Sequence, residues 1–467
     1  MTSSYPAPTF RDPDGSLVLE DDRAVRTIRD SARLSVLRFL ESPFYRRIQE
    51  RGDVVATAID DSPTGLFLHH PRIPIPTYPW EWTPSQWVAA AELTLNLCQE
   101  ALNEGWILKD ATPLNVLFEG PRPVFVDVLS FDERDPATSI WLAYGQYVRT
   151  FLLPLLMNRL LHWPLALSLF RRDGYEPAEL FAALGWRQRF SRNAFWPITL
   201  PAWLERSKGE STGTSPKALQ RATNPELALH ILESTLKKLR RQTRRAISSL
   251  KSSDWSEYPA QLSHYTAEQA RNKKEWVRDI VENLRPARTL DIGANIGEYS
   301  ALVAETGAEV VALERDAASA DKIFRMSQDR KLPIQTIHAD LARPTPAVGW
   351  DNNESSALLS RLEGQFDLVL MLAVVHHLLL LEQIPLRAIA ALCHRLTCRH
   401  LLLEWVPVSD PMFQELMRGR EALYSSLHED DFLAGCNEFF TLLRRHTLGN
   451  GRILLLLEKN SLQGIPC

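Results

Sequence analysis

Apolar and amphipathic segments alternate along the last two hundred residues of the chain, a pattern that predicts strands separated by helices. Short apolar runs cover residues 289–292, 309–314, 334–337, 366–372 and 400–405. Runs that are apolar throughout are typical of strands buried on both faces of a parallel sheet. Residues 442–447 and 452–458 flank a Gly-Asn-Gly turn and predict a closing hairpin. We therefore predict an α/β domain over residues 263–467.

The first apolar run ends in a tight turn that opens a helix, with Asp291, Gly293, Asn295 and Gly297 at alternate positions. Glycines let the backbone approach a ligand closely, and the first N–H groups of the following helix are free to bind a polar ligand. A dinucleotide-binding turn has the spacing Gly-x-Gly-x-x-Gly, whereas Asn295 stands at the central glycine and fits a pyrophosphate poorly. The turn indicates a nucleotide-type cofactor; the alternative is a glycine-rich turn without a ligand.

The motif Asp-x-Gly-x-Asn-x-Gly resembles the first motif of the class I S-adenosylmethionine (SAM)-dependent methyltransferases. The resemblance implies a Rossmann-like domain with a mostly parallel seven-stranded sheet, an antiparallel last strand and SAM as cofactor. Glu314 follows the turn by about 20 residues, where such folds place a carboxylate on the ribose hydroxyls. Asp340 matches the acid that contacts adenine, and Leu372 completes the implied cofactor-binding set. Read without the resemblance, Glu314 is a solvated acid at the end of a strand.

Further segments resemble a bacterial group of methyltransferases related to the nodulation protein NoeA. They are Pro-Ala-Val-Gly-Trp at 346–350, the apolar run that ends in His376 and His377, Ile-Pro-Leu at 384–386, and Glu-Trp-Val-Pro at 404–407 with Asp-Pro-Met at 410–412. This resemblance covers residues 263–467 and implies methyl transfer. We expect a small-molecule or glycan-like acceptor.

Three residues are candidates for a catalytic role. His376 and His377 follow the fourth strand, beside the place where the methyl group is expected, and a neutral imidazole is suited to proton transfer near pH 7. The alternative is that both histidines shape the pocket or cap the next helix. Glu404 ends the fifth strand and is a candidate for contact with the acceptor.

Residues 265–284 predict an amphipathic helix that ends before Pro286. In methyltransferases, a helix before the first strand covers the SAM site. Tyr265 and Lys273 therefore either face the cofactor or are a core tyrosine and a surface lysine.

The N-terminal half carries a weaker pattern. Asp110 and Asn115 have the Asp-x-x-x-x-Asn spacing of a protein-kinase catalytic loop. Asp127 ends a short apolar run, at the position where kinases keep a magnesium-binding aspartate. The preceding stretch from Trp87 to Gly105 predicts the helix that leads into such a loop.

Other kinase features are missing. Lys109 is the first lysine of the chain, so no lysine precedes the loop to hold phosphates, and no glycine-rich loop is present upstream. Leu108 replaces the histidine of the loop, and Val-Leu follows Asp127 in place of Phe-Gly. The pattern favours a degenerate kinase-like module that binds a ligand or serves as a scaffold. Active phosphotransfer and an unrelated hairpin are the alternatives.

The predicted organisation is an N-terminal α+β domain over 1–206, a linker with a basic helix over 207–262, and the methyltransferase domain over 263–467. The helix expected from residue 225 to 250 carries these basic residues towards its end: Lys237, Lys238, Arg240, Arg241, Arg244 and Arg245. They indicate either a solvated face or a docking site for an acidic protein partner or anionic substrate.

Composition restricts the remaining possibilities. The 467 residues carry a net charge of −4, so a nucleic-acid partner is not expected. The five cysteines lack metal-ligand spacing, and we expect a reducing, cytoplasmic setting without a bound metal. The first residues do not resemble a signal peptide. The apolar segment 151–170 contains Pro154 and Arg159 and predicts buried helices in place of a membrane span.

Overall fold

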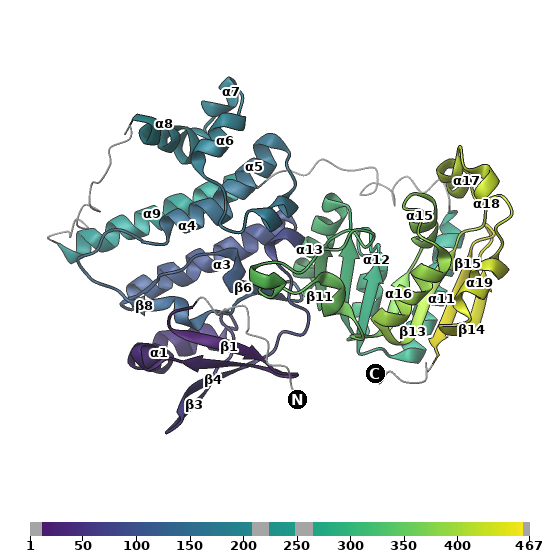
Figure 1. Cartoon of the computed structure of the whole chain (residues 1–467), viewed down its shortest axis with the longest axis horizontal. Coiled ribbons are helices and arrows are strands. Elements are labelled where there is room, and N and C mark those ends of the chain that lie inside the picture. The colour runs from purple at the N-terminus through teal and green to yellow at the C-terminus, as the bar shows by residue number, and fades with distance from the viewer. Residues whose placement is uncertain (1–11, 208–223, 248–264, 461–467) are drawn as a thin grey trace. The chain divides into compact units, whose positions relative to one another are not determined.

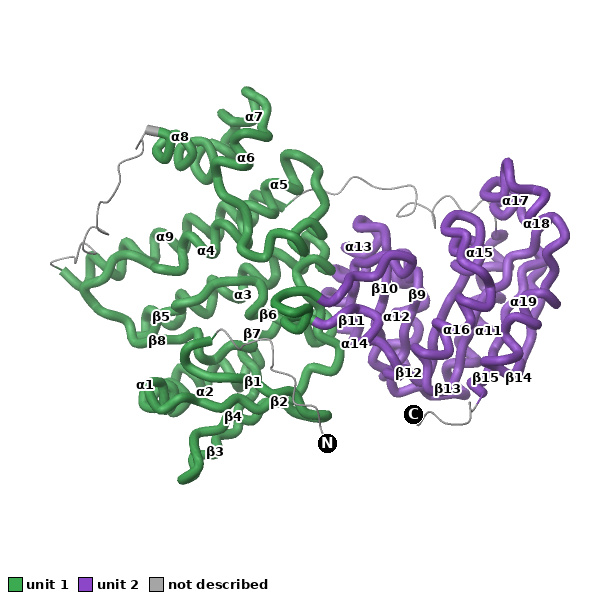
Figure 2. The backbone as a smooth tube through the Cα atoms, in the orientation of Figure 1, with its two compact units in different colours: residues 1–249, 348–355 green, residues 250–347, 356–467 purple. Residues whose placement is uncertain are grey.

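The computed structural model describes residues 12–207, 224–247 and 265–460 (Figure 1). The chain forms two compact units, shown in two colours in Figure 2. The first contains Met1–Ser249 and Val348–Ser355, and the second contains Leu250–Ala347 and Ser356–Cys467. Most of the predicted linker lies outside the described residues, but its basic helix is present as α9 (Pro225–Ala246).

Among the described residues of the second unit, seven strands form one sheet. They are β9 (Arg288–Ile292), β10 (Glu309–Glu314), β11 (Ile334–His338), β12 (Phe366–Met371), β13 (Thr397–Trp405), β14 (Phe440–Thr447) and β15 (Ile453–Lys459). Their order across the sheet is β11-β10-β9-β12-β13-β15-β14. Strand β15 is antiparallel to both of its neighbours, and the pairs on the other side of β13 are parallel. This is the predicted class I methyltransferase sheet with its antiparallel last strand, and the prediction is confirmed.

Helices flank this sheet (Figure 1). Their bounds are α11 (Ala267–Leu284), α12 (Glu298–Ala304), α13 (Ala317–Arg330), α14 (Leu358–Leu362), α15 (Val375–Leu380), α16 (Leu386–Leu396), α17 (Pro411–Met417), α18 (Glu421–Tyr424) and α19 (Glu429–Cys436). One core cluster joins Val277 and Val281 of α11 with Leu368 and Leu370 of β12. The two leucines are two positions apart in β12, so their side chains face the same side of the sheet and both reach this cluster.

Helix α11 begins two residues after the predicted start. The Thr266 hydroxyl accepts a hydrogen bond from the backbone N–H of Gln269, and the Gln269 side chain accepts one from the N–H of Thr266. This reciprocal capping satisfies two otherwise free backbone donors at the start of the helix. Arg285 ends the helix in the left-handed conformation, directly before Pro286.

The strand order places a topological switch at β9. The chain passes from β9 to β10 and β11 on one side, and then returns to β12 on the other side of β9. In open α/β sheets, ligands bind outside the carboxyl ends of the strands at such a point. The segments after β9 and β12 therefore define the place where a site is expected.

The described part of the first unit begins with an antiparallel four-stranded sheet, in the order β1-β2-β4-β3. The strands are β1 (Gly15–Leu19), β2 (Arg23–Ile28), β3 (Ala58–Ser62) and β4 (Gly65–Pro71), and α1 (Asp30–Glu41) and α2 (Pro43–Glu50) lie between β2 and β3 in the chain. Next come α3 (Pro84–Asn103), β5 (Trp106–Leu108), β6 (Val116–Glu119), β7 (Arg122–Phe125) and β8 (Phe131–Glu133). Hairpin β6–β7 and the pair β5–β8 are both antiparallel.

Helices complete the first unit: α4 (Tyr144–Tyr147), α5 (Leu153–Leu161), α6 (Pro177–Ala183), α7 (Trp186–Arg189), α8 (Leu200–Ser207) and α9. The apolar segment predicted to form buried helices contains a π-helical turn at Val148–Leu152 and then α5, whose first residues are buried. Within the described ranges, no helix combines the length and apolar character that a membrane crossing requires.

The basic face of α9 is partly used within the first unit. Arg244 forms an ion pair with Glu92 of α3, and Arg240 donates to Asn96 of the same helix at 2.6 Å. Lys238 lies over the ring of Trp196 at 5.2 Å from its centroid. These contacts fix α9 on α3, and docking of an acidic partner on this helix stays a prediction.

Candidate active site

The predicted turn after β9 has the backbone conformation that its residues favour. Gly293, Asn295 and Gly297 all have positive φ angles of 68°, 50° and 82°. Glycine adopts this region freely, and asparagine adopts it more readily than other residues with a side chain. The N–H groups of Gly293 and Ala294 donate to the carbonyl of Leu313 in β10, at 2.9 and 3.2 Å. The turn is thereby held against the neighbouring strand, and it opens α12 as predicted.

Close packing also requires glycine in this turn. A Cβ atom built on Gly293 would lie 2.5 Å from Cγ2 of Val374, in the segment that follows β12. A Cβ atom on Gly297 would lie 3.0 Å from the terminal methyl of Met326 in α13. The turn therefore contacts the segment across the topological switch.

Glu314 ends β10 and holds the turn through its carboxylate. Its Oε2 accepts from the N–H of Asn295 and its Oε1 accepts from the N–H of Asp316, both at 2.7 Å. An ionised carboxylate offers about four acceptor positions, so both oxygens keep capacity for a further donor. Burial raises the pKa of Glu314 to about 7.

Asp291 and Asn295 lie on the buried side of the same turn. The Ser300 hydroxyl donates to Asp291 at 2.6 Å, and burial raises the pKa of Asp291 to about 6. Among the described residues, the buried side-chain oxygen of Asn295 has no hydrogen-bond donor. A buried polar atom without a partner is costly, and a polar ligand in the turn would satisfy it.

The remaining predicted cofactor residues lie at the same edge of the sheet. Asp340 follows β11, accepts from the N–H of Ala342 at 2.9 Å and forms an ion pair with Arg343 at 3.1 Å. Leu372 directly follows β12 and is 9% exposed. All seven predicted cofactor residues thus stand in or beside the carboxyl ends of four neighbouring parallel strands. Their contact with a cofactor stays a prediction.

His376 and His377 lie in α15, just beyond Leu372. Their ring centroids are 4.2 Å apart. Burial lowers the pKa of His376 well below its usual value and that of His377 to about 4. His376 is 3% exposed, and its Nδ1 has no partner in the described part of the chain. Both imidazoles are therefore neutral at pH 7, and their role as a base stays a prediction.

Glu404 lies at the centre of a buried ionic cluster, formed by Tyr265, Lys273, Glu404, Asp410 and Arg452. Glu404 is fully buried and accepts from Lys273 at 2.6 Å, from Arg452 at 3.3 Å and from the Tyr265 hydroxyl. Arg452 donates to both oxygens of Asp410 at 2.8 and 3.3 Å. Burial alone would raise the pKa of Glu404, but Lys273 and Arg452 hold it below its usual value.

This cluster changes the interpretation of several residues. Lys273 is 6% exposed, so the alternative of a surface lysine is wrong. In this structure the oxygens of Glu404 face three donors of the chain, and its contact with an acceptor stays a prediction. The sequence analysis missed Asp410 and Arg452 as partners of Glu404. A basic residue directly before the apolar run of β15 was the available signal for Arg452.

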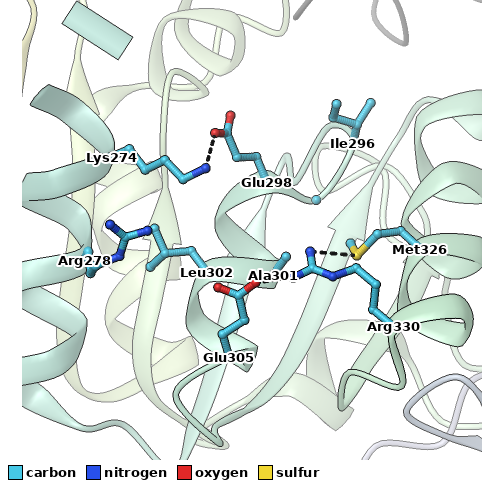
Figure 3. Close-up of a pocket in the computed structure, with 10 residues that line it drawn as sticks. Lys274, Arg278, Ile296, Glu298, Ala301, Leu302, Glu305, Met326 and Arg330 are labelled. Atoms are coloured by element: carbon cyan, nitrogen blue, oxygen red, sulfur yellow. Dashed lines mark hydrogen bonds and ion pairs between the residues drawn. The ribbon is translucent and has the colours of Figure 1, made fainter. Parts of the chain in front are cut away.

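A cavity of about 180 Å³ is lined by residues of α11, α12 and α13 (Figure 3). It shares Ile296 and Gly297 with the turn, and the Lys274–Glu298 ion pair at 2.9 Å lies on its wall. Binding sites for cofactors and other small molecules usually have larger volumes, of about 300–1,000 Å³, and mostly apolar walls. We therefore do not assign the cofactor to this cavity.

No known family profile matches the chain. Its sequence is 30% identical over 471 residues to the nodulation protein NoeA of Rhizobium meliloti (strain 1021), covering 97% of this chain and 96% of that protein. The chain belongs to the NoeA family. The match extends over both units, so the N-terminal unit is part of the family's common architecture.

Two solved structures are also similar to this NoeA-family chain. N-methyltransferase NodS from Bradyrhizobium japonicum WM9 is 12% identical with a TM-score of 0.31, over 41% of this chain and 97% of NodS. Magnesium protoporphyrin IX methyltransferase (ChlM) from Synechocystis PCC 6803, solved with bound SAH, is 17% identical with a TM-score of 0.30, over 41% of this chain and 84% of ChlM. The fold assignment rests on the strand order and not on these values.

The turn provides a first testable prediction for this NoeA-family protein. Gly293→Ala is expected to weaken SAM binding at least about tenfold, because the new methyl group meets Val374 and the residue has φ of 68°. Titration calorimetry with SAM measures the effect. Gly364→Ala is the matched control, since Gly364 also has a positive φ but has no atom within 4 Å of its added Cβ. Equal losses in the two variants would contradict a specific role of the turn.

Proposed function

We propose that the second unit is a SAM-dependent methyltransferase. The observation that carries the proposal is the glycine turn after β9, held by the carboxylate of Glu314 at the topological switch of the sheet. A class I methyltransferase fold with an acid at this strand end fits a nucleoside-type cofactor. Fold alone does not define an activity, and the proposal therefore rests on these side chains.

The residues present fit SAM. The two oxygens of Glu314 keep acceptor capacity for the two ribose hydroxyls, and we assign Asp340, which follows β11, as the acceptor for the adenine amine. The backbone of Gly293 is exposed and carries no side chain to block the amino-acid part, and the unpaired oxygen of Asn295 is a polar partner in the same turn. When bound, SAM supplies an intrinsically electrophilic methyl group.

The chain's own contribution is mainly orientation. Holding two reactants in line accounts for a large part of the acceleration in such reactions. The neutral His376 and His377 are able to receive a proton from the acceptor, and burial lowers the pKa of both, so each is a weak base. We propose that one of them hydrogen-bonds the acceptor and accepts its proton as a general base.

We further propose a small-molecule or glycan-like acceptor. Leu372 and His376, where the methyl group is expected, are 9% and 3% exposed. A narrow group can reach such a depth, whereas a flat protein surface cannot. The buried ionic cluster then stabilises the elements α11, β13 and β15 around the site.

The test is transfer of a labelled methyl group. The full chain is incubated with SAM carrying a labelled methyl and with a fractionated bacterial cell extract. Label in the small-molecule or glycan fraction, absent with Glu314→Ala, is expected. Label in the protein fraction would contradict the proposed acceptor, and no transfer to any fraction would contradict the proposed activity.

SAM binding is expected to depend on pH through Glu314. The ionised carboxylate accepts two hydroxyl donors, whereas the protonated acid does not, and its pKa in the free protein is about 7. Binding therefore releases a proton below this pH, and the Kd is expected to rise about tenfold for each pH unit below 7. Asp291, with a pKa of about 6, adds a second dependence below that value. Calorimetry across this range measures the slope; an unchanged slope in Glu314→Gln would contradict the assignment.

A further inference from the structure

The first unit contains a polar cluster that the proposed methyl transfer does not use. We call it the Arg26 cluster, formed by Arg26, Lys109, Asn115 and Asp127. Arg26 lies in β2, Lys109 and Asn115 lie between β5 and β6, and Asp127 follows β7. Two of the kinase-like residues, Asn115 and Asp127, are therefore brought together with an arginine that the sequence analysis did not include, whereas Asp110 accepts from Gln146 at 2.6 Å.

Arg26 is the central cation of the Arg26 cluster. It is 4% exposed, and its Nη1 donates to Asp127 at 2.8 Å across 101 residues of sequence. The other oxygen of Asp127 accepts from the Ser130 hydroxyl, and the Asn115 side chain donates to Ser130 at 3.0 Å. Ser130 thus links the two residues that would hold a metal in a kinase.

The order of elements explains this position. In kinases, the phosphate-binding lysine of Val-Ala-Ile-Lys lies on an N-lobe strand before helix C. Here Arg23-Ala24-Val25-Arg26 lies on β2, which leads directly into α1. Arginine stays charged when buried and binds phosphate oxygens in a bidentate manner. The search for a lysine missed this site because the cation is an arginine.

Two carboxylates before β1 bind the cations of the cluster. Asp12 accepts from Arg26 at 3.3 Å, and Asp14 accepts from Lys109. Together with Asp127, these carboxylates neutralise both cations in the ligand-free chain, so a bound phosphate has to displace carboxylate partners of Arg26 and Lys109.

Two buried nitrogen atoms beside the cluster are also unsatisfied. Nε of Arg26 and Nε2 of His70 have no hydrogen-bond partner among the described residues. His70 lies in β4, in register with Ala24 of β2. Unpaired buried polar atoms of this kind indicate a ligand or water that completes their bonding.

We propose that the Arg26 cluster binds the phosphates of a magnesium–nucleoside triphosphate. Arg26 exchanges Asp127 for a phosphate oxygen, and Asp127 and Asn115 take the metal. Asp12 and Asp14 occupy positions of phosphate oxygens in the ligand-free chain and compete with the nucleotide. Within the described residues, no group of three or more His, Cys, Asp or Glu side chains is arranged to hold a metal. This agrees with Mg²⁺, which is commonly bound by one or two carboxylates together with substrate phosphates.

The experiment is titration of the full chain with ATP in the presence of magnesium. The wild type is expected to bind, and the double variant Asp12→Asn, Asp14→Asn is expected to bind at least about tenfold more tightly, because charge-assisted competitors are removed. Arg26→Met is expected to bind at least about tenfold more weakly. Arg23→Met is the matched control on the same strand, since the Arg23 side chain is 51% exposed and pairs with Glu20.

Each outcome decides a part of the proposal. Absence of ATP binding by both the wild type and the double variant would overturn the nucleotide site. Unchanged affinity in the double variant would overturn competition by Asp12 and Asp14. Asp127→Asn is expected to remove the dependence on magnesium, and retention of that dependence would overturn the metal position. Because Arg26→Met removes a buried charge, Arg26→Lys and a thermal melt of each variant distinguish lost binding from lost folding.

Discussion

Glu314→Ala is expected to weaken SAM binding at least about a hundredfold. Hydrogen bonds to a charged group contribute about 1.5–3 kcal/mol each, and two such bonds to the ribose correspond to about two orders of magnitude or more in Kd. The alanine also releases the N–H of Asn295 from its acceptor, so the turn loses its link to β10. Both consequences act on the same ligand. Titration calorimetry with SAM at pH 8 measures the loss.

The control for Glu314→Ala is Glu309→Ala. Glu309 is the first residue of the same strand, where it is exposed and pairs with Arg288 at 3.0 Å. This variant is expected to bind SAM with unchanged affinity. Glu314→Ala with wild-type affinity, or equal losses in the two variants, would mean that β10 does not end at the cofactor.

Arg452→Met is expected to lower the free energy of unfolding of the second unit by about 3–5 kcal/mol, since removal of one partner leaves buried charges uncompensated. Arg452 is 1% exposed and bonds to both Glu404 and Asp410. Without the Arg452 guanidinium, Asp410 loses the cation that it pairs with, whereas Glu404 keeps Lys273. The lost stability therefore comes mainly from the ionic contacts that join the ends of β13 and β15. Urea denaturation of the full chain, followed by tryptophan fluorescence, measures the transition.

Arg444→Met is the matched control for this stability prediction. Arg444 lies in β14 of the same sheet, its side chain is 46% exposed, and it pairs with Asp279 at 2.8 Å. Exposed pairs contribute about 0–1 kcal/mol, so this variant is expected to shift the transition little. A similar shift in the two variants would show that the buried ionic cluster contributes no more to the free energy of unfolding than an exposed ion pair.

The strands and the turn of the second unit were predictable because their signals are local. Buried parallel strands are apolar throughout, and Gly293, Asn295 and Gly297 are residue types that adopt positive φ. Strand ends were predicted less closely. Strand β13 begins at Thr397, three residues before the predicted start, because Thr397 pairs with Phe366 and its hydroxyl donates to the Phe366 carbonyl. The exposed positions that follow hide this extension in the sequence.

Contacts between distant residues were not predictable from local patterns. Arg452 meets Glu404 across 48 residues, and Arg26 meets Asp127 across 101. Arg452 belongs to no motif, and Arg26 stands where the kinase motif has a lysine, so each becomes visible only once the fold places it beside its carboxylate. The sequence analysis therefore selected Glu404 and Asp127 and missed the arginine that contacts each of them.

The most direct test of the central claim is calorimetric titration of the full chain with SAM, with NAD titrated in parallel. The account predicts one SAM bound per chain, no binding of NAD, and loss of SAM binding in Glu314→Ala. Binding of NAD in place of SAM would contradict the assignment of the turn. Binding of neither compound by the folded chain would contradict the proposed methyltransferase itself.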